Sequence, residues 1–325
     1  MSIKISGIGS FLPAGTLNNA DFEEVLDTTD EWITQMTGIK ERHISGEEDD
    51  YLDCCYQAAC AAINQADVHA QNIDLIIIGT STPYQLMPST AVMLQQKLAI
   101  ERCISFDIQA ACSGFIYALA NAFYLMQANP RIHCALVLGC DAFFNLTDPL
   151  DRTTRILFGD GFGAFLLTRN DHHKEKGIFY CDIGADGYGK NALEIPWGVA
   201  KGFSALTTQK PYIVMNGRQV FKNAIDQFVT NIQNALKETH LTIDDLQQII
   251  THQANIRIIN AVASALDIPV EKFHVTLDRH GNTSAASIPL AFDDLLHQGK
   301  INRGELILLT AFGAGYTWGT IIFEF

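Results

Sequence analysis

Residues 103–128 read CISFDIQAACSGFIYALANAFYLMQA and combine a strand, a turn and a helix in succession. The β-branched and aromatic residues of 103–108 predict the strand. Residues 112–128 contain no charged side chain and are apolar around the whole helix. In a water-soluble chain, a helix that is apolar all round is buried on every side. We therefore expect this helix to lie in the interior of the fold.

The uncharged stretch 108–130 could in principle cross a membrane, because about 20 apolar residues span a bilayer. It follows a strand without a break, however, and no basic flank orients it. Polar residues and a glycine interrupt it at Gln109, Ser113, Gly114, Asn121 and Gln127. We expect no membrane partner.

On either side of this stretch, short β-branched runs alternate with helical patterns, which is typical of an α/β fold with largely parallel strands. The predicted strands are 3–9, 74–80, 103–108, 134–140, 162–168, 178–184, 247–252, 273–276, 305–311 and 318–324. The predicted helices are 50–66, 89–98, 112–128, 216–238, 255–265 and 284–297.

The second half of the chain repeats the element order of the first, which indicates an internal duplication of about 160 residues. We expect an N-terminal half of residues 1–170 and a C-terminal half of residues 171–325. In open α/β sheets, ligand sites lie beyond the carboxyl ends of strands. The turns at 109–114, 251–255 and 280–284 fall at such positions.

Composition excludes several classes of function. The 325 residues include 22 Lys and Arg against 36 Asp and Glu, for a net charge of −14. We therefore expect no nucleic-acid partner, because phosphate contacts need a basic face. The eight cysteines form no CxxC pair and no zinc-like spacing with histidine, so we expect no metal and reduced, cytosolic thiols. The N-terminus lacks the pattern of a signal peptide, which points to the cytoplasm.

Cys112, His252 and Asn282 are the residues best suited to chemistry. Cys112 begins the apolar helix, where the positive end of the helix dipole favours thiolate. His252 ends an apolar strand, and Asn282 lies in a turn. The three could form a papain-like hydrolase set. Alternatively, His252 and Asn282 could both donate to one substrate oxygen and stabilise an enolate.

Six motifs across the chain resemble those of β-ketoacyl-acyl carrier protein synthase III, a family of the thiolase superfamily. The resemblance covers Ile5 to Phe325. The matching segments are TTDEWI at 28–33 with TGIKERHI at 37–44, AACSGF at 110–115, FGDGFGA at 158–164, HQANIRII at 252–259, LDRHGNTSAASIPLA at 277–291 and AFGAGYTWG at 311–319.

The resemblance implies a thiolase-like fold with two mainly parallel sheets that sandwich buried helices in the layer order αβαβα. Cys112 would be the acylated nucleophile, and His252 and Asn282 would bind the malonyl thioester carbonyl. The backbone N–H groups of Cys112 and Ala314 would form an oxyanion hole. The implied reaction condenses a short acyl-CoA with malonyl-acyl carrier protein and initiates fatty acid synthesis. It needs no tightly bound cofactor, and the implied assembly is a homodimer.

The family's remaining contacts transfer to this chain with some departures. Met36 stands where the family commonly has an arginine against the adenine, Met87 where Phe is commoner, and Ala314 where Gly is commoner. The implied coenzyme A contacts are Trp32 on the adenine, Arg152 on phosphate and Asn255 along the pantetheine arm. The implied carrier-docking residues are Arg218, Lys222 and Arg257, and those of the acyl pocket are Met87, contributed by the partner subunit, and Phe312.

Other activities remain to be distinguished from this one. The departures at Met36, Met87 and Ala314 leave room for a paralogue with a different primer or a duty in secondary metabolism. A cysteine thioesterase or hydrolase, or a thioester binder without activity, would share much of the site. The resemblance also implies that a thiolase-like condensation without decarboxylation needs a second catalytic cysteine in the C-terminal half. No cysteine follows Cys181, so we do not expect that activity.

Overall fold

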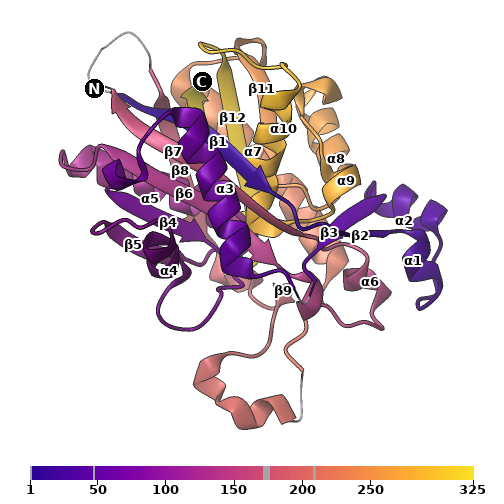
Figure 1. Cartoon of the computed structure of the whole chain (residues 1–325). Helices are drawn as coiled ribbons and strands as arrows, with labels where there is room; N and C mark the ends of the chain where they lie inside the picture. The colour runs from indigo at the N-terminus through magenta and orange to yellow at the C-terminus, as the bar shows by residue number, and fades with distance from the viewer. Residues whose placement is uncertain (1, 47, 171–175, 208–209) are drawn as a thin grey trace.

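Two sheets form the framework of the computed structural model, which describes residues 2–46, 48–170, 176–207 and 210–325 (Figure 1). The first sheet has the strand order β1 (Ser2–Phe11), β7 (Asp160–Asn170), β6 (Cys134–Ala142), β4 (Leu75–Gly79) and β5 (Ile104–Ile108). The second has the order β11 (Leu246–Thr251), β12 (Leu306–Gly313), β13 (Thr317–Glu324) and β8 (Ile178–Ala185).

Both sheets are mixed, which corrects the prediction of mainly parallel strands. The parallel pairs are β4 with β5, β4 with β6, and β11 with β12. In contrast, β7 is antiparallel to β6 and β1, and β13 is antiparallel to β12 and β8. Only residues 314–316 join β12 to β13. A parallel pair requires a crossover of a dozen or more residues, so this short connection makes the pair antiparallel.

The two sheets share an order of four strands, as the expected duplication requires. β1, β7, β6 and β4 correspond in order to β8, β13, β12 and β11. The fifth strand, β5, has no full counterpart, because the predicted strand 273–276 is wrong: Phe273 forms only an isolated parallel bridge to Ile249. The expected boundary between residues 170 and 171 borders residues 171–175, which lie outside the described residues.

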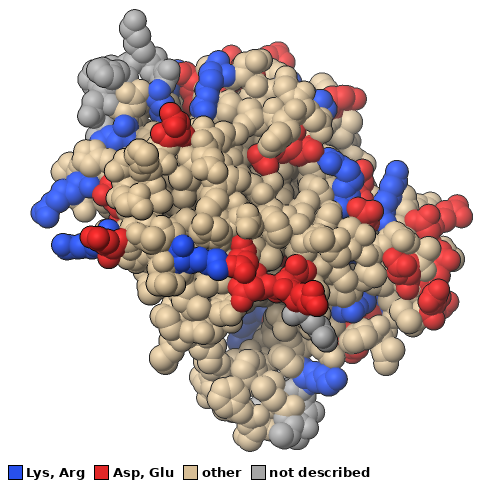
Figure 2. All heavy atoms as spheres, in the orientation of Figure 1, with Lys and Arg blue, Asp and Glu red and all other residues tan. Residues whose placement is uncertain are grey.

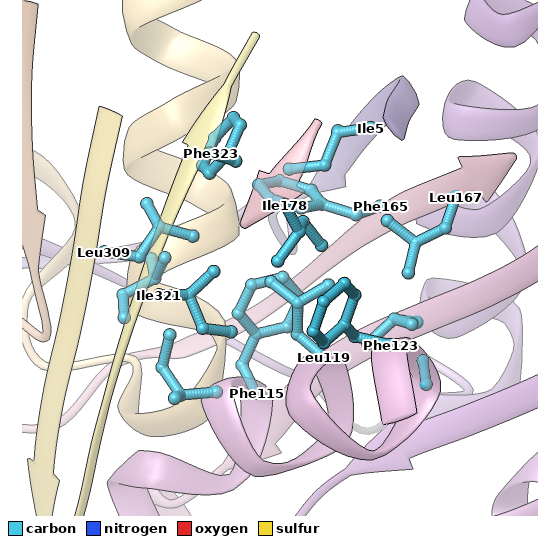
Figure 3. Close-up of a cluster of buried hydrophobic side chains, with 14 of the residues drawn as sticks. Ile5, Phe115, Leu119, Phe123, Phe165, Leu167, Ile178, Leu309, Ile321 and Phe323 are labelled. Atoms are coloured by element: carbon cyan, nitrogen blue, oxygen red, sulfur yellow. The ribbon is translucent and has the colours of Figure 1, made fainter. Parts of the chain in front are cut away.

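Helices occupy three layers around the sheets, which gives the order αβαβα. Helices α3 (Tyr51–Ala66) and α4 (Thr90–Lys97) cover the outer face of the first sheet. Helices α7 (Gly217–Thr239) and α8 (Ile256–Leu266) form the outer layer at the second sheet. Between the sheets lie α5 (Gly114–Ala128) and α10 (Ser287–His297), each in contact with strands of both. Figure 3 shows Phe115, Leu119 and Phe123 of α5 among side chains from both sheets.

The central helix α5 is held by the second sheet as well as by the first. Phe115, Ile116 and Leu119 are fully buried. The hydroxyls of Tyr117 and Tyr124 donate to the backbone oxygens of Gly184 and Cys181 in β8, over 2.7 and 3.1 Å. Most of α5 is buried, as its uncharged sequence predicted, but the expectation of burial on every side is wrong: Tyr117 and Asn121 are half-buried and 40% of Tyr124 is exposed. No helix of the described residues is long and apolar enough to cross a membrane.

Smaller elements surround the carboxyl ends of the strands. They are β2 (Gly15–Asn18), α1 (Ala20–Glu23), α2 (Asp30–Thr37), β3 (Glu41–Ile44), α6 (Arg152–Arg155), β9 (Leu193–Glu194), β10 (Val214–Met215) and α9 (Leu277–His280). Two short 3-10 turns, η2 (Ala111–Ser113) and η9 (Ser284–Ala286), precede α5 and α10. The predicted helices that began at 112 and 284 therefore start as 3-10 turns.

Candidate active site

Cys112 lies in η2, between the end of β5 and the start of α5. The preceding residue, Ala111, has a φ of +48°, a left-handed conformation that few non-glycine residues adopt. A Cβ atom on Gly313 would lie only 2.9 Å from the backbone nitrogens of Cys112 and Ser113. Glycine is therefore required at 313, and it lets the end of β12 pack directly against the turn that holds the cysteine.

His252 follows the last residue of β11, and its backbone N–H donates to Thr310 of β12. Its ring atom Nδ1 lies 2.8 Å from Ser287 Oγ, and that hydroxyl donates to the backbone oxygen of Ser284 over 2.9 Å. Because a hydroxyl carries one proton, Ser287 accepts its second hydrogen bond from Nδ1–H. In the neutral ring, Nε2 is then the unprotonated nitrogen that is available to a ligand.

Asn282 is fixed by bonds at its backbone and at one end of its carboxamide. Its N–H donates to Leu157, and its backbone oxygen accepts from Gly159. Its side-chain oxygen accepts the N–H of Ser284 over 2.9 Å. The remaining end of the carboxamide is the NH₂ group, which has two protons to donate. Asn282 therefore presents donors to a ligand.

A single cavity of about 560 Å³ unites the three residues, since Cys112, His252 and Asn282 all line it. Cys112 comes from the first half of the sequence and the other two from the second, as the sequence predicted. The walls of the cavity are largely apolar and include Leu157, Phe158, Val220, Phe221, Phe228 and Phe312. A cavity of this size, with mostly apolar walls, suits a small-molecule acyl substrate rather than a polymer.

Burial sets the protonation of the nucleophile and the imidazole. It raises the pKa of the Cys112 thiol to about 12, although a hydrogen bond from Ser284 opposes the rise. It lowers the pKa of His252 to about 4. At neutral pH the two groups are therefore a neutral thiol and a neutral imidazole. This corrects the expectation of a resting thiolate, because the loss of hydration outweighs the helix terminus.

The neutral pair bears on the alternatives left open by the sequence. A papain-like site keeps a thiolate and an imidazolium as a resting ion pair, and burial opposes both of those charges at Cys112 and His252. Donation from the Asn282 NH₂ group to a substrate oxygen needs no resting charge, whereas donation from Nε2 of His252 begins only once that nitrogen has gained a proton. The geometry of Asn282, with its NH₂ group free, is suited to the second arrangement.

A buried carboxylate behind the cavity escaped the sequence analysis. Asp141 ends β6 with no exposed surface. It accepts hydrogen bonds from the loop after β4, at Thr80, Ser81 and Thr82, and from the backbone of Ala285. Burial raises its pKa to about 6, against these bonds. Asp141 therefore ties the turn that follows Asn282 to the first sheet.

Of the three residues implied for coenzyme A, Trp32 and Asn255 line the cavity, whereas Arg152 is outside its lining. Trp32 lies in α2, and Asn255 is the N-cap of α8. The guanidinium of Arg152 lies 4.9 Å from the centre of the Trp32 ring. The side-chain nitrogen of Asn255 donates to the backbone oxygen of Met36 over 2.9 Å, so α2 and α8 meet at this point.

The implied docking and pocket residues are dispersed around the cavity. Arg218 and Arg257 line the cavity, whereas Lys222 lies outside it on the exposed face of α7. Arg257 contacts the sulfur of Met36 and lies 5.6 Å over the Phe221 ring. Phe312 and Ala314 also line the cavity. Met87 does not, and 81% of its surface is exposed.

Comparison with known proteins gives consistent matches. A family model described as 3-oxoacyl-[acyl-carrier-protein (ACP)] synthase III matches residues 106–187, and one described as its C terminal matches 236–325. A β-ketoacyl-[acyl-carrier-protein] synthase III of Thioalkalivibrio sulfidiphilus is 42% identical over 99% of both chains. Solved synthase III structures from Aquifex aeolicus VF5 and Pseudomonas aeruginosa PAO1 are 40% and 36% identical, with TM-scores of 0.92 and 0.93; each covers 100% of this chain, and 100% and 98% of its own.

The layered, internally duplicated fold and the cysteine at its buried helix define a condensing enzyme of the thiolase-like class. Such enzymes are acyltransferases. Within that class, the chain belongs to the 3-oxoacyl-[acyl-carrier-protein] synthase III family.

Proposed function

We propose that the protein condenses a short acyl group from acyl-CoA with malonyl-acyl carrier protein, releases CO₂ and initiates fatty acid synthesis. The observation that carries this proposal is the convergence of Cys112, His252 and Asn282 on one apolar cavity with a narrow set of polar groups. Family membership supports it independently. The proposal requires no metal and no tightly bound cofactor, because coenzyme A enters and leaves with the substrate.

In the first stage, Cys112 attacks the thioester carbon of acyl-CoA. The thiol is neutral at rest, so it needs a base, and the unprotonated Nε2 of His252 is suited to accept its proton. A bond forms between Sγ and the acyl carbon, and the bond from that carbon to the coenzyme A sulfur breaks. The proton on Nε2 then passes to the departing coenzyme A thiolate.

In the second stage, malonyl-acyl carrier protein enters and loses CO₂ to leave an enolate. Its carbon attacks the acyl group on Cys112, and Cys112 departs as a thiolate, so the stage consumes one proton. We assign that proton to Nε2 of His252, which takes it up from water as the negatively charged malonyl group enters and favours the imidazolium. The Nε2–H and the NH₂ group of Asn282 donate to the enolate oxygen while its charge develops. The Nε2 proton finally converts the thiolate back to the thiol.

The remaining contacts follow from the same proposal. Backbone N–H groups of Cys112 and Ala314 hold the oxyanion of the acyl transfer, Trp32 stacks on the adenine and Arg152 meets phosphate. Asn255 lies along the pantetheine arm. Arg218, Lys222 and Arg257 receive the acidic carrier protein at the rim formed by α7 and α8.

We further propose a cytoplasmic homodimer. All eight cysteines are free, as suits a reducing compartment. β5 is the edge strand of the first sheet, and its first residue, Ile104, is exposed. Leu86 and Met87, in the segment between β4 and α4, are exposed as well. A second copy would cover them, and Met87 would then reach the acyl pocket of its partner together with Phe312.

The decisive experiment is to load the protein with a panel of acyl-CoAs and to find the modified residue by intact and peptide mass. We expect one acyl group on Cys112 and none on a Cys112→Ala variant. Added malonyl-acyl carrier protein should then give a product two carbons longer. Release of free acid would instead indicate a thioesterase. Binding of the thioester without either product would indicate a thioester binder without activity, and both outcomes would overturn the proposal.

A further inference from the structure

Ser284 touches the nucleophile and has a strained backbone. Its Oγ lies 3.4 Å from Cys112 Sγ, in donor geometry, and the residue has no exposed surface. Its φ is +50°, a conformation that costs a non-glycine side chain stability. A glycine would fit the backbone better, so the presence of a serine calls for a use of its hydroxyl.

The same hydroxyl also influences a second buried group. The Ser284 side chain favours the charged form of Asp141 and so lowers its pKa against the effect of burial, although the hydrogen bond of the hydroxyl goes to the Cys112 sulfur. The described titratable groups around the sulfur are Asp141 and His252. A negative Asp141 repels a thiolate at Cys112. The side chain that hydrogen-bonds to the sulfur and can stabilise its negative charge is therefore that of Ser284.

We infer that Ser284 is a further catalytic residue, whose hydroxyl donates to the Cys112 sulfur whenever that sulfur carries negative charge. This inference rests on the proposed role of Cys112 as nucleophile. In the thiol and thioester states sulfur is a weak acceptor, so the hydrogen bond from Ser284 is weak. As the thiolate forms in either stage, the same hydrogen bond strengthens. The hydrogen bond is thus stronger in the charged state, which is the condition for catalysis.

The test compares Ser284→Ala and Ser284→Gly with the wild type. Both remove the hydroxyl, but only glycine relieves the positive φ, so a result common to both belongs to the hydroxyl. Thr283→Val is the matched control, because Thr283 Oγ1 is buried next door without a hydrogen-bond partner. The readouts are the alkylation rate of Cys112 with iodoacetamide between pH 7 and 10, and the rates of acylation and condensation.

We expect both Ser284 variants to alkylate about tenfold more slowly at each pH, as a rise of about one unit in the thiol pKa requires. Acylation and condensation should each fall about 10- to 100-fold, and Thr283→Val should match the wild type. An unchanged alkylation rate, or full activity in Ser284→Gly, would overturn the inference. Failure of wild-type Cys112 to become acylated would instead contradict the proposed function, because alkylation does not depend on it.

Discussion

Asn282 illustrates how a single residue is oriented for its role. The carboxamide oxygen is occupied by the Ser284 N–H, and the backbone is held by Leu157 and Gly159. The NH₂ group is therefore the end that can serve a substrate. A preorganised donor of this kind needs no rearrangement when charge develops on an oxygen in front of it.

Replacing Asn282 by Ala should slow condensation about 100- to 1,000-fold, because one of two donors to the enolate oxygen is lost. Acylation of Cys112 should stay within a few-fold of the wild type, because that stage does not use the carboxamide. The two rates are measured separately, by mass for acylation and by product formation for condensation. Equal loss in both stages would contradict the assigned role.

At the residue scale, the sequence named three candidate residues, whose chemical roles stay predictions. Cys112, His252 and Asn282 each stood at a predicted turn, and the cavity brings all three together. Ser284 and Asp141 were not predictable, because their contacts join residues 172 and 144 positions apart. The available signal was weak: a serine two residues after Asn282, and a carboxylate at the end of an apolar strand.

At the element scale, acidic and basic side chains gather on different elements. Figure 2 shows acidic side chains gathered over α1 and α2, where residues 21–31 include Asp21, Glu23, Glu24, Asp27, Asp30 and Glu31. Arg218 and Lys222 lie on α7, with Arg257 beside them on α8, and Arg257 also contacts Met36 at the end of α2. An acidic carrier is repelled by the acidic residues of 21–31 and attracted by these three basic residues.

Reversal of charge in Arg257→Glu should therefore impair condensation with malonyl-acyl carrier protein by about tenfold or more at low salt, and the defect should shrink as salt screens it. Acylation by acyl-CoA should be spared. Lys237→Glu, near the far end of α7, makes the same change in net charge and serves as the control. Equal damage to both stages, or an equal effect of the control, would refute a docking role.

Elements were predicted well where local pattern decides them and poorly where distant side chains do. The main helices begin and end within about three residues of their predicted limits. The predicted strand 273–276 fails because a side chain replaces the strand partner. Gln253 donates to the backbone oxygen of His274 and accepts the N–H groups of Thr276 and Leu277. The antiparallel pair of β2 and β3 was missed, because α1 and α2 lie between the two strands in the sequence and no short turn marks the pairing.

On the scale of the whole molecule, buried titratable groups couple stability to pH. Burial lowers the pKa of His252 and of His280 from 6.5 to about 4, and raises that of Asp141 from 3.8 to about 6. As pH falls from 6.5 to 4, the unfolded chain binds protons at both histidines and the folded chain does not, which destabilises the fold. Asp141 acts in the opposite sense, because the folded form binds its proton first.

Across that window, each histidine lowers the free energy of unfolding by about 3 kcal/mol. Asp141 raises it by about the same amount and so cancels the effect of one histidine. These three groups together should therefore lower the free energy of unfolding by about 3 to 4 kcal/mol between pH 6.5 and 4. In His280→Phe, which keeps a ring in the same site, most of the net fall should disappear. Urea unfolding at a series of pH values measures this, and an unchanged slope in the variant would contradict it.

The position of α5 has a consequence for synthesis of the protein. The ribosome completes this apolar helix well before it makes β12 and β13, and β8, whose carbonyls bind Tyr117 and Tyr124, comes later than α5 as well. Until then the nascent chain exposes the apolar surface of α5, which favours aggregation or binding by chaperones. Residues 1–170 expressed alone should be insoluble, and expression with residues 171–325 should rescue them. Soluble, monomeric material from the first fragment would show that α5 needs no cover from the rest of the chain.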